Sequence, residues 1–366
     1  MIVIPWLLSK YYNMTISNQG IGEMSRELKT VDQLENRYLD ERISWLLPQF
    51  EALAPYKLNQ RKKGVDGLLG WERLAAIEAK NLKTAFPDEG PEDERLYATA
   101  INQITALKKA LKIAAKTHLK DHAHYHPVLT ITTHFGDALS YQFANYKERQ
   151  NTRYKQVVEE RVKPENRVEI DLTDSLKYAY NILTDIKKGS DANWLDISCA
   201  IALTTGRRMA EVHLSATFEK LDTHTVAFKG QLKGKSRKVK QGDKAVYLRD
   251  IIFKIPTLLP AELVCYALQW LDEKGKRFPQ TEDPERVNRR FSKTLNEACK
   301  QWEIFPTDER TYHKFRAAYL RAAIVNANID PYDFIGFAKA VLGDDDENTI
   351  DTYKRYQIKP GTLTRI

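Results

Sequence analysis

The side chains able to do chemistry in this sequence are scattered cations, one histidine and a tyrosine near the C-terminus. Cleaving a phosphodiester without a metal requires a nucleophile, cations to hold the charge on the pentavalent phosphate, and an acid for the leaving oxygen. A guanidinium fork binds two phosphate oxygens, so Arg208 and Arg316 suit a clamp. Lys233 suits the general acid, because a lysine can give up its proton. Tyr353 supplies a hydroxyl nucleophile.

The segment TYHKFRAAYLRAA predicts a helix that carries two of these candidates. His313 and Arg316 are 3 residues apart and therefore share a helix face, from which they can reach one phosphate together. Phe315, Ala318 and Ala322 would supply the packing face of the same helix.

Each candidate taken alone also has an ordinary structural interpretation. Arg208 fits a helix-surface cation, and Lys233 is one of 6 cations between positions 233 and 244. His313 fits a core or cap residue, and Tyr353 fits a contact of an amphipathic helix. Their joint order and spacing favour the functional interpretation.

Four short motifs resemble, in order and spacing, the active site of the tyrosine recombinases: TTGRRMAE, FKGQLKGK, HKFR and VLGDDDENTIDTY. That family supplies an arginine after a TG turn, a hairpin lysine, a His/Lys-x-x-Arg helix, a His or Trp, and the tyrosine. The intervals here are 25 residues from Arg208 to Lys233, 3 from His313 to Arg316, and 9 from Asp344 to Tyr353. The resemblance implies catalytic roles for Arg208, Lys233, His313, Arg316, Asp344 and Tyr353.

Within that superfamily the local wording is most similar to the protelomerases, or telomere resolvases. TGRRMAE, GQLK, YHKFRAAYLR and the stretch from LGDDDENT to YKRY carry this likeness, which spans residues 166 to 357. It implies an enzyme that cuts an inverted-repeat DNA site and reseals each strand to its complement as a hairpin. The N-terminal half resembles only the family's general plan of a helical DNA clamp.

Two features depart from the family pattern. Asp344 stands where the family usually has histidine or tryptophan, and an ionised carboxylate would repel a phosphate. It is either protonated, or orients Arg316 or His313 from behind, or marks an altered activity; a helix cap within Asp344–Asp346 is the structural alternative. Few residues follow Tyr353, whereas many protelomerases continue into a further DNA-binding module. A minimal form or a truncated chain would then recognise its site through the N-terminal clamp.

Further cations are candidates for contacts with the phosphate backbone. Those around the hairpin lysine and in VNRRFSK are Lys235, Arg237, Lys238, Arg289 and Arg290. Lys108, Lys112, Lys116 and Lys120 follow one another at intervals of 4, which predicts a line along a helix. That line either tracks DNA or is a solvated helix face.

The remaining signals for metals and cofactors are weak. The sequence has no Walker loop, dinucleotide fingerprint, zinc pattern or nucleophile elbow. His118, His122, His124 and His126 form a short histidine-rich tract in which the first two are one turn apart. Without accompanying cysteines or acids, a surface tract near a helix C-terminus is the better interpretation. We expect no metal and no cofactor.

The apolar periodicity predicts a mainly α protein with a small β-sheet (α+β). Helices are expected through Val31, Leu34, Tyr38 and Trp45, with a capping box at Thr30 and Gln33, from Trp71 to before Pro87, and through Tyr97 to Leu111. The charged stretch EERVKPEN separates a helical DNA-clamp region, 1–160, from a recombinase-like catalytic domain, 167–366. In the latter, further helices are expected at 176–183, 194–201 and in three later segments. THTVAFKGQL and KAVYLRDI are expected to form a β-hairpin or a small sheet edge.

Composition is consistent with a polyanionic partner. Lys and Arg total 57 against 49 Asp and Glu, which gives a net charge of +8. Cys199, Cys265 and Cys299 are widely spaced and odd in number, as expected of reduced core thiols in a cytoplasmic protein. The apolar start MIVIPWLL is too short to span a bilayer and has no basic region before it. No membrane association is expected.

These observations lead to a mechanistic hypothesis. Two protomers close on a palindromic duplex, and each Tyr353 attacks one strand to leave a 3′-phosphotyrosyl bond and a free 5′ hydroxyl. A protelomerase would then join each strand to its complement, whereas an integrase would exchange strands between two duplexes. The catalytic residues would be the same for both, so their chemistry leaves the choice open. A relative that binds DNA without cleaving it is the third possibility.

Overall fold

The computed structural model describes residues 39–55, 68–86, 94–118, 125–234, 238–241, 244–344 and 346–366. The chain divides into two compact units, Met1–Gln156 and Val157–Ile366, each with its own hydrophobic core. The described residues are mainly helical with three small β-sheets, which confirms the predicted fold class. Within these ranges no helix is both long and apolar enough to cross a membrane.

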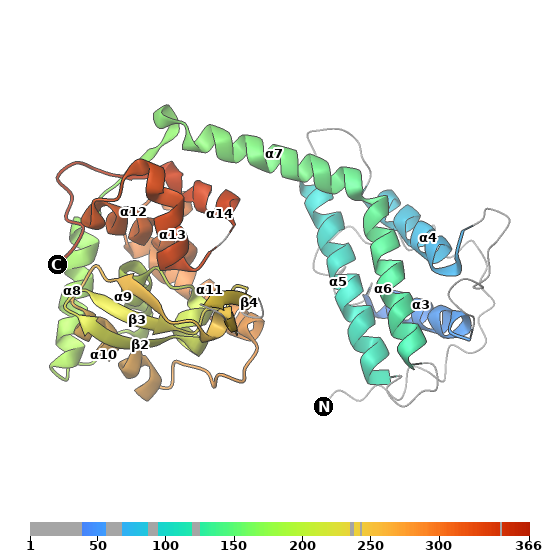
Figure 1. The fold of residues 1–366 in the computed structure, drawn as a ribbon, viewed down its shortest axis with the longest axis horizontal. Coiled ribbons are helices and arrows are strands. Elements are labelled where there is room, and N and C mark those ends of the chain that lie inside the picture. Colours follow the sequence, from blue (N-terminus) through green and yellow to red (C-terminus); the bar gives the residue numbers. More distant parts are fainter. Residues whose placement is uncertain are drawn as a thin grey trace. The chain divides into compact units, whose positions relative to one another are not determined.

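The described part of the first unit is built from helices that share one core (Figure 1). They are α3 (Leu39–Leu53), α4 (Gly70–Ala85), α5 (Glu94–His118), α6 (Tyr125–Gln142) and the start of α7 (Ala144–Val162). α6 packs against α3, α4 and α5, and the rings of Phe50 and Phe135 meet with centroids 5.2 Å apart. The helices predicted before Pro87 and through Leu111 are thus confirmed as α4 and α5. Thr30, Val31, Gln33, Leu34 and Tyr38 lie outside the described residues.

α7 leads from the first unit to the second. Its side chains are largely exposed, apart from Tyr146, whose hydroxyl donates a hydrogen bond to the Phe86 carbonyl at 3.2 Å. The boundary between the compact units falls inside this helix, after Gln156. The charged segment EERVKPEN, predicted to separate the two domains, therefore begins as helix and continues into a short 3-10 turn, Pro164–Asn166.

The second unit surrounds a buried helix, α9 (Trp194–Thr205). Every residue of α9 from Asp196 to Thr205 is buried, so this helix is enclosed on all sides. It packs against α8 (Thr173–Lys187), α10 (Ala261–Glu273), α11 (Pro284–Ala298) and α12 (Phe315–Ala327). α13 (Phe334–Leu342) and the short α14 (Glu347–Asp351) follow near the C-terminus.

Three small sheets complete the second unit. β2 (Thr217–Asp222), β3 (Thr225–Lys229) and β6 (Phe253–Pro256) form an antiparallel sheet with β3 in the middle. β4 (Lys238–Gln241) and β5 (Lys244–Tyr247) form an antiparallel pair. β1 (Val168–Ile170) pairs in parallel with β7 (Tyr356–Ile358), so the end of the chain returns to the start of the unit.

The two stretches predicted as strands are strands, but they do not pair with each other. THTVAFKGQL contains β3, whose neighbours are β2 and β6, and KAVYLRDI contains β5, whose neighbour is β4. The prediction of one hairpin between them was wrong because each strand pairs with an antiparallel strand that is nearer to it in the sequence. The alternative of a small sheet edge holds for β5, which lies in a two-stranded sheet, but not for β3, which is the central strand of its sheet.

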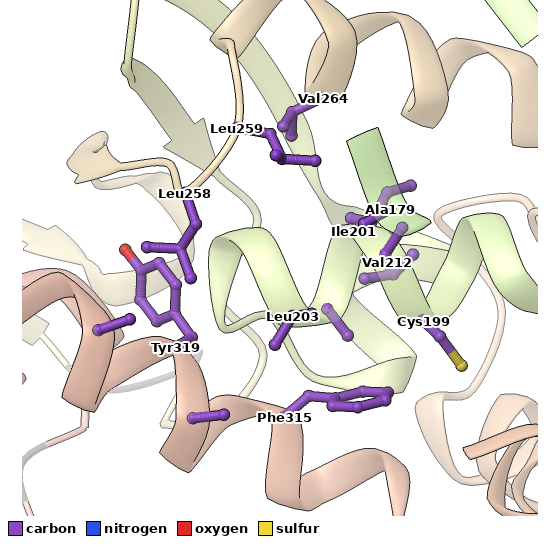
Figure 2. Packing of buried hydrophobic residues seen from close by; sticks show 14 of the residues in the cluster. Ala179, Cys199, Ile201, Leu203, Val212, Leu258, Leu259, Val264, Phe315 and Tyr319 are labelled. Atoms are coloured by element: carbon purple, nitrogen blue, oxygen red, sulfur yellow. The ribbon is translucent and has the colours of Figure 1, made fainter. Parts of the chain in front are cut away.

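Side chains packed around α9 hold this helix in place, and with it the start of the segment that follows it. Figure 2 shows α9 side chains, including Cys199 and Leu203, among Phe315 and Tyr319 of α12 and the segment Leu258–Leu259. Cys199 and Cys299 are buried, Cys265 is partly buried, and all three are free thiols. The predicted reduced core thiols are therefore observed for the first two.

Candidate active site

The chain leaves α9 through a turn that only glycine can make. Gly206 has φ +67°, and a Cβ built there would lie 2.3 Å from Cδ1 of Tyr319. The backbone therefore passes close to α12, and the next two residues are the arginines of the TGRR motif.

Of these two arginines, Arg207 is structural. It is 1% exposed, donates to the Val341 carbonyl at 2.6 Å and to the Thr205 carbonyl at 3.1 Å, and lies 4.4 Å above the ring of Phe228. Burial, with the nearby Arg316 charge, lowers its pKa to about 10. Its guanidinium ties the end of α9 to the end of α13.

Arg208 instead reaches two carboxylates. Its backbone N–H donates to Glu211 Oε2 at 3.0 Å, its Nη1 lies 3.3 Å from Glu211 Oε1, and its Nη2 pairs with Asp344 Oδ2. Glu211 is fully buried. Burial raises the pKa of Glu211, but the guanidiniums of Arg207, Arg316 and Arg208 outweigh it, so the net pKa is lowered. Glu211 is therefore a charged partner that orients Arg208.

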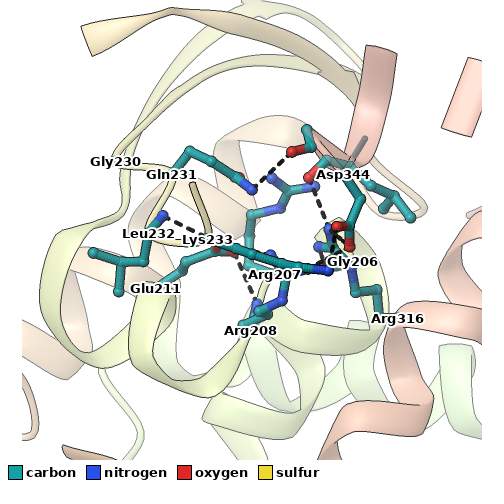
Figure 3. Close-up of polar contacts among 12 residues, drawn as sticks. Gly206, Arg207, Arg208, Glu211, Gly230, Gln231, Leu232, Lys233, Arg316 and Asp344 are labelled. Atoms are coloured by element: carbon teal, nitrogen blue, oxygen red, sulfur yellow. Dashed lines mark hydrogen bonds and ion pairs between the residues drawn. The ribbon is translucent and has the colours of Figure 1, made fainter. Parts of the chain in front are cut away.

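Asp344 is the point at which three of the predicted residues meet (Figure 3). Its Oδ2 pairs with Arg208 and lies 3.5 Å from Nη2 of Arg316, and its Oδ1 lies 2.6 Å from Nζ of Lys233. Asp344 is 1% exposed. Burial alone would raise its pKa, but the Lys233 hydrogen bond and the charges of Arg208, Arg316 and Lys233 lower it. The lowered pKa favours an ionised carboxylate over the protonated alternative.

The structure also separates Asp344 from the helix cap considered for the acidic run. Asp346 caps α14, because its side chain accepts a hydrogen bond from the Asn348 N–H at 3.1 Å. Asp344 lies outside that cap and is occupied by the three cations.

Arg316 sits at the beginning of α12 and is almost fully buried, with 1% exposure. Its Nη1 donates to the Gly206 carbonyl at 2.6 Å and its Nη2 to the Leu342 carbonyl at 2.7 Å. These bonds join the turn after α9, α12 and the end of α13. They also place the guanidinium beside Asp344.

Lys233 reaches the cluster from a loop whose path requires a glycine at position 230. Gly230 has φ +112°, and a Cβ built there would lie 2.0 Å from the Ser215 carbonyl oxygen. The next residue, Gln231, is fully buried and donates from Nε2 to the Gly343 carbonyl at 3.1 Å. This bond ties the loop to the backbone just before Asp344. The Lys233 side chain itself is 46% exposed.

His313 lies in the 3-10 turn Tyr312–Lys314 that precedes α12, and not on the helix as predicted. The turn is tighter because Tyr312 is anchored by its N–H to Asn296 Oδ1 at 3.0 Å and by its hydroxyl to the Ser198 carbonyl at 3.0 Å. His313 reaches the surface, but desolvation, followed by the charges of Arg316 and Arg208, lowers its pKa to about 4. The ring is therefore neutral near pH 7. Phe315, Ala318 and Ala322 are buried, which confirms the predicted packing face.

Tyr353 is buried and makes no hydrogen bond to the Asp344 cluster within the described residues. It lies in the 3-10 turn Thr352–Arg355, is 3% exposed, and its hydroxyl has no hydrogen-bond partner within the described ranges. The structure thus joins Arg208, Lys233, Arg316 and Asp344 directly, whereas the phenol makes no hydrogen bond to them.

The segment that carries Tyr353 is anchored on its C-terminal side by Glu309. Glu309 pairs with Arg355, accepts a hydrogen bond from the Tyr356 hydroxyl, and lies 3.5 Å from Nζ of Lys314. Burial raises the pKa of Glu309, but its partners Arg355, Tyr356 and Lys314 outweigh that effect and lower it. Glu309 therefore connects the Tyr353 segment to the turn that holds His313.

The cations predicted to contact the phosphate backbone of DNA lie in different environments. Lys235 and Arg237 lie outside the described residues, as do His122, His124 and Lys120. Lys238, Arg289 and Arg290 are exposed, as are Lys112 and Lys116 on α5. Lys108 differs from the line expected along that helix, because its Nζ lies 3.0 Å from Ser140 Oγ and 3.4 Å from Asp137 of α6. Among the residues with assigned positions, no group of three His, Cys, Asp or Glu side chains can hold a metal ion.

Sequence reasoning missed three residues of this site: Arg207, Glu211 and Gln231. Glu211 alone left a signal, because a glutamate three residues after Arg208 suits a pair within one helical turn. Arg207 and Gln231 contact backbone carbonyls far away in the sequence, which no local pattern encodes.

Comparison with known proteins agrees with this geometry. Residues 166–356 match the family described as the telomere resolvase ResT/TelK catalytic domain, and this chain belongs to that family. The protelomerase of Escherichia phage N15 is 30% identical over 214 residues, which are 54% of this chain and 33% of that protein. The protelomerase of Klebsiella oxytoca phage phiKO2 is 31% identical over 169 residues, 44% of this chain and 26% of that protein. The match thus spans about a third or less of these relatives.

A solved structure extends the likeness to the fold of most of the chain. Protelomerase TelA, covalently complexed with substrate DNA, superposes with a TM-score of 0.59 at 19% identity, covering 93% of this chain and 94% of that one. A point mutant of TelA complexed with a DNA hairpin product gives a TM-score of 0.53 at 19% identity, covering 85% of this chain and 94% of that one.

Proposed function

We propose that this chain is a protelomerase: it cleaves an inverted-repeat DNA site and rejoins the strands as covalently closed hairpins. The observation that carries this proposal is the convergence of Arg208, Lys233 and Arg316, from three separate segments, on one carboxylate. A carboxylate and a phosphate both offer oxygens to charged donors, so a site built to hold one can hold the other. Membership of the telomere resolvase family supports the hairpin outcome over strand exchange.

In the proposed reaction the Tyr353 oxygen attacks the scissile phosphorus. A bond forms between that oxygen and phosphorus, the bond to the 5′ oxygen breaks, the phenol proton passes to solvent, and Lys233 gives a proton to the leaving oxygen. Arg208 and Arg316 hold the charge of the pentavalent phosphate, and neutral His313 adds a hydrogen bond. The energy of the broken bond stays in the phosphotyrosyl ester, so rejoining needs no nucleotide cofactor.

Asp344 would change partners in this reaction. In the free protein it neutralises cations that would otherwise lie close together without a counter-ion. A phosphate entering the cluster competes with Asp344 for Arg208 and Lys233, whose side chains are 19% and 46% exposed. The pairing of Asp344 with these cations thus lowers the affinity of the free site for phosphate.

We propose that two copies act together on one palindromic duplex, each supplying one Tyr353. Exposed cations such as Lys112, Lys116, Lys238, Arg289 and Arg290, together with Lys235 and Arg237, would add contacts to the backbone. The enzyme would be encoded by a phage or plasmid and would work in the cytoplasm of a bacterial host. It would need no metal or cofactor.

A second candidate is a DNA-binding relative that does not cleave. Two observations favour it: Asp344 is ionised inside the cation cluster, and the Tyr353 hydroxyl is buried. Both candidates bind DNA, so the difference lies in whether a covalent bond forms.

A nicked suicide duplex that carries the inverted repeat distinguishes them. We expect wild-type protein to trap a covalent DNA adduct that resists denaturation, and Tyr353→Phe to abolish it. Tyr332→Phe is the matched control, because Tyr332 is 97% exposed and outside the cluster. Wild-type protein that binds the duplex without forming an adduct would support the non-cleaving candidate.

An intact inverted-repeat duplex then separates hairpin formation from strand exchange. On a denaturing gel, hairpin products migrate as single strands of doubled length that snap back on cooling. Joined products between two differently labelled duplexes would contradict the protelomerase proposal.

A further inference from the structure

A cation-lined pocket lies outside the Asp344 cluster, where the chain passes from α10 to α11. It encloses about 280 Å³ and is lined by Gly275, Lys276, Arg277, Phe278, Arg286, Arg290 and Phe291. Four of these residues are cations and none is acidic. A water molecule takes up ~30 Å³ of liquid, so the pocket has room for a phosphate group with part of its hydration. Its charge selects an anion.

The cations of this pocket differ in how far they are already engaged. Arg290 has neither a hydrogen bond nor an ion pair to any residue that the structure places. Arg286, one helical turn earlier on α11, is 2.7 Å from Glu282, and Lys276 lies 5.3 Å from the ring of Trp194. Arg290 is therefore the cation most available to a ligand.

Hydrogen bonds hold part of the pocket lining in place in the free protein. Arg277 donates from Nε to the Val212 carbonyl at 3.0 Å and from Nη2 to the Ala216 carbonyl at 2.7 Å. The Phe278 N–H donates to the His213 carbonyl at 2.7 Å. These bonds hold the loop Gly275–Phe278 against the segment that follows Arg208, so little ordering is left to occur on binding.

His213 extends this scaffold toward the candidate active site. Burial lowers the pKa of His213 to about 4, so the ring is neutral and has one N–H. Nδ1 donates to the Lys276 carbonyl at 2.8 Å, and Nε2 accepts from Ser198 Oγ at 2.7 Å. Ser198 in turn holds Tyr312, whose hydroxyl donates to the Ser198 carbonyl at 3.0 Å. A buried chain of bonds thus fixes the pocket relative to Tyr312 and the adjacent His313.

We propose that this pocket is a second phosphate site, which holds a DNA backbone phosphate away from the one that is cleaved. The inference rests on the proposed DNA-binding function and adds a specific anchor to it. Because the pocket is fixed relative to His313, a phosphate bound in it would set the position of the duplex along the second unit. Because it contacts phosphate and not base edges, it adds affinity and register in every sequence context.

The test compares Arg290→Gln with Lys274→Gln in DNA binding over a series of salt concentrations. Lys274 is the matched control, because it lies two residues before Lys276 but pairs with Asp191 at 2.9 Å and does not line the pocket. Removing one phosphate contact lowers the slope of log affinity against log salt by about 0.9. We expect that decrease for Arg290→Gln and no decrease for Lys274→Gln. Equal slopes for the two variants would overturn the proposal.

A duplex series with a single uncharged methylphosphonate at each position identifies the phosphate. We expect one position at which wild-type protein loses its advantage in affinity over Arg290→Gln, because the contact is already absent. If no position shows this loss, the pocket does not bind a DNA phosphate. The same conclusion follows if inorganic phosphate stabilises the protein thermally, Arg290→Gln abolishes that stabilisation, and DNA binding is unchanged. Wild-type protein that fails to bind any duplex would instead overturn the proposed function itself. Arg290 is exposed, so circular dichroism should report an unchanged fold for the variant.

Discussion

Asp344 places a carboxylate among three cations of the candidate site. It stands where the family pattern usually has histidine or tryptophan, and it pairs with three cations that a phosphate would also use. The sequence pointed to Arg208, Lys233 and Arg316 through residue type and spacing. It did not reveal Arg207 and Gln231, since their partners are backbone carbonyls brought near only by folding, and it marked Glu211 only by its spacing of three residues from Arg208.

Asp344→Asn should weaken the fold and strengthen DNA binding. Breaking a buried ion pair by removing one partner costs about 3 kcal/mol, so we expect a loss of that order in the free energy of unfolding at pH 7. The folded-state pKa of Asp344 lies below its ordinary 3.8, so its stabilisation is present above that pH and is lost as the pH falls through the lower value. Urea unfolding at pH 7 and in acid measures this.

The control for this experiment is Asp333→Asn, which changes an exposed carboxylate. We expect it to leave both the unfolding free energy and the salt dependence of DNA binding close to wild type. A stability difference between Asp344→Asn and wild type that persists equally in strong acid would contradict an origin in charge.

His313 should stay neutral throughout the physiological range. Burial and the cations Arg316 and Arg208 lower its pKa to about 4 from an ordinary 6.5. The unfolded chain then binds more protons than the folded one between those values, so the fold loses stability as pH falls from 6.5 toward 4. The ring C2–H signal in an NMR titration, assigned by its absence in His313→Gln, should not move between about pH 8 and 5.5. A midpoint near the ordinary value would show that the cations do not act on the ring.

At the scale of elements, helical periodicity predicted most of the helices, because an amphipathic helix records its buried face in its own sequence. Pairing of strands was harder to predict. β3 and β5 lie in different sheets because β2 and β4 compete successfully for their edges. The turn at His313 also departs from the predicted helix, since Asn296 and Ser198 hold Tyr312 from outside that segment.

Glu309 links two such elements, and its charge should affect cleavage more than binding. Glu309→Gln keeps an acceptor for the Tyr356 hydroxyl but removes the charge that holds Arg355 and Lys314. We expect the rate of adduct formation on a nicked duplex to fall about tenfold, which corresponds to ~1.4 kcal/mol of positioning. DNA affinity should change little, because Glu309 faces the Tyr353 segment.

Glu303→Gln is the matched control, because Glu303 is 80% exposed and lies 3.6 Å from Arg310 in the same region. It should leave both rate and affinity near wild type. If Glu309→Gln lowers affinity and rate by the same factor, the residue stabilises the fold generally and does not position Tyr353.

For the whole molecule, the important feature is that each compact unit has a core of its own. Leu107 and Leu203 are fully buried, the first in the N-terminal core and the second in the C-terminal one. Replacing either with alanine should cost ~2–5 kcal/mol in its own unit. Calorimetry should therefore show two transitions, with Leu107→Ala lowering one and Leu203→Ala lowering the other. Transitions that shift together in both variants would contradict independent cores.

The sequence by itself predicted most of the helices, the proposed class of chemistry and the order of the catalytic candidates, because helix periodicity and side-chain chemistry are local properties. Tertiary structure alone decided that Asp344 is shared by three cations that lower its pKa, that Arg207 ties two helix ends together, and that the Tyr353 hydroxyl is buried. These properties depend on burial and on charges far apart in the chain, and burial exists only once the helices have packed.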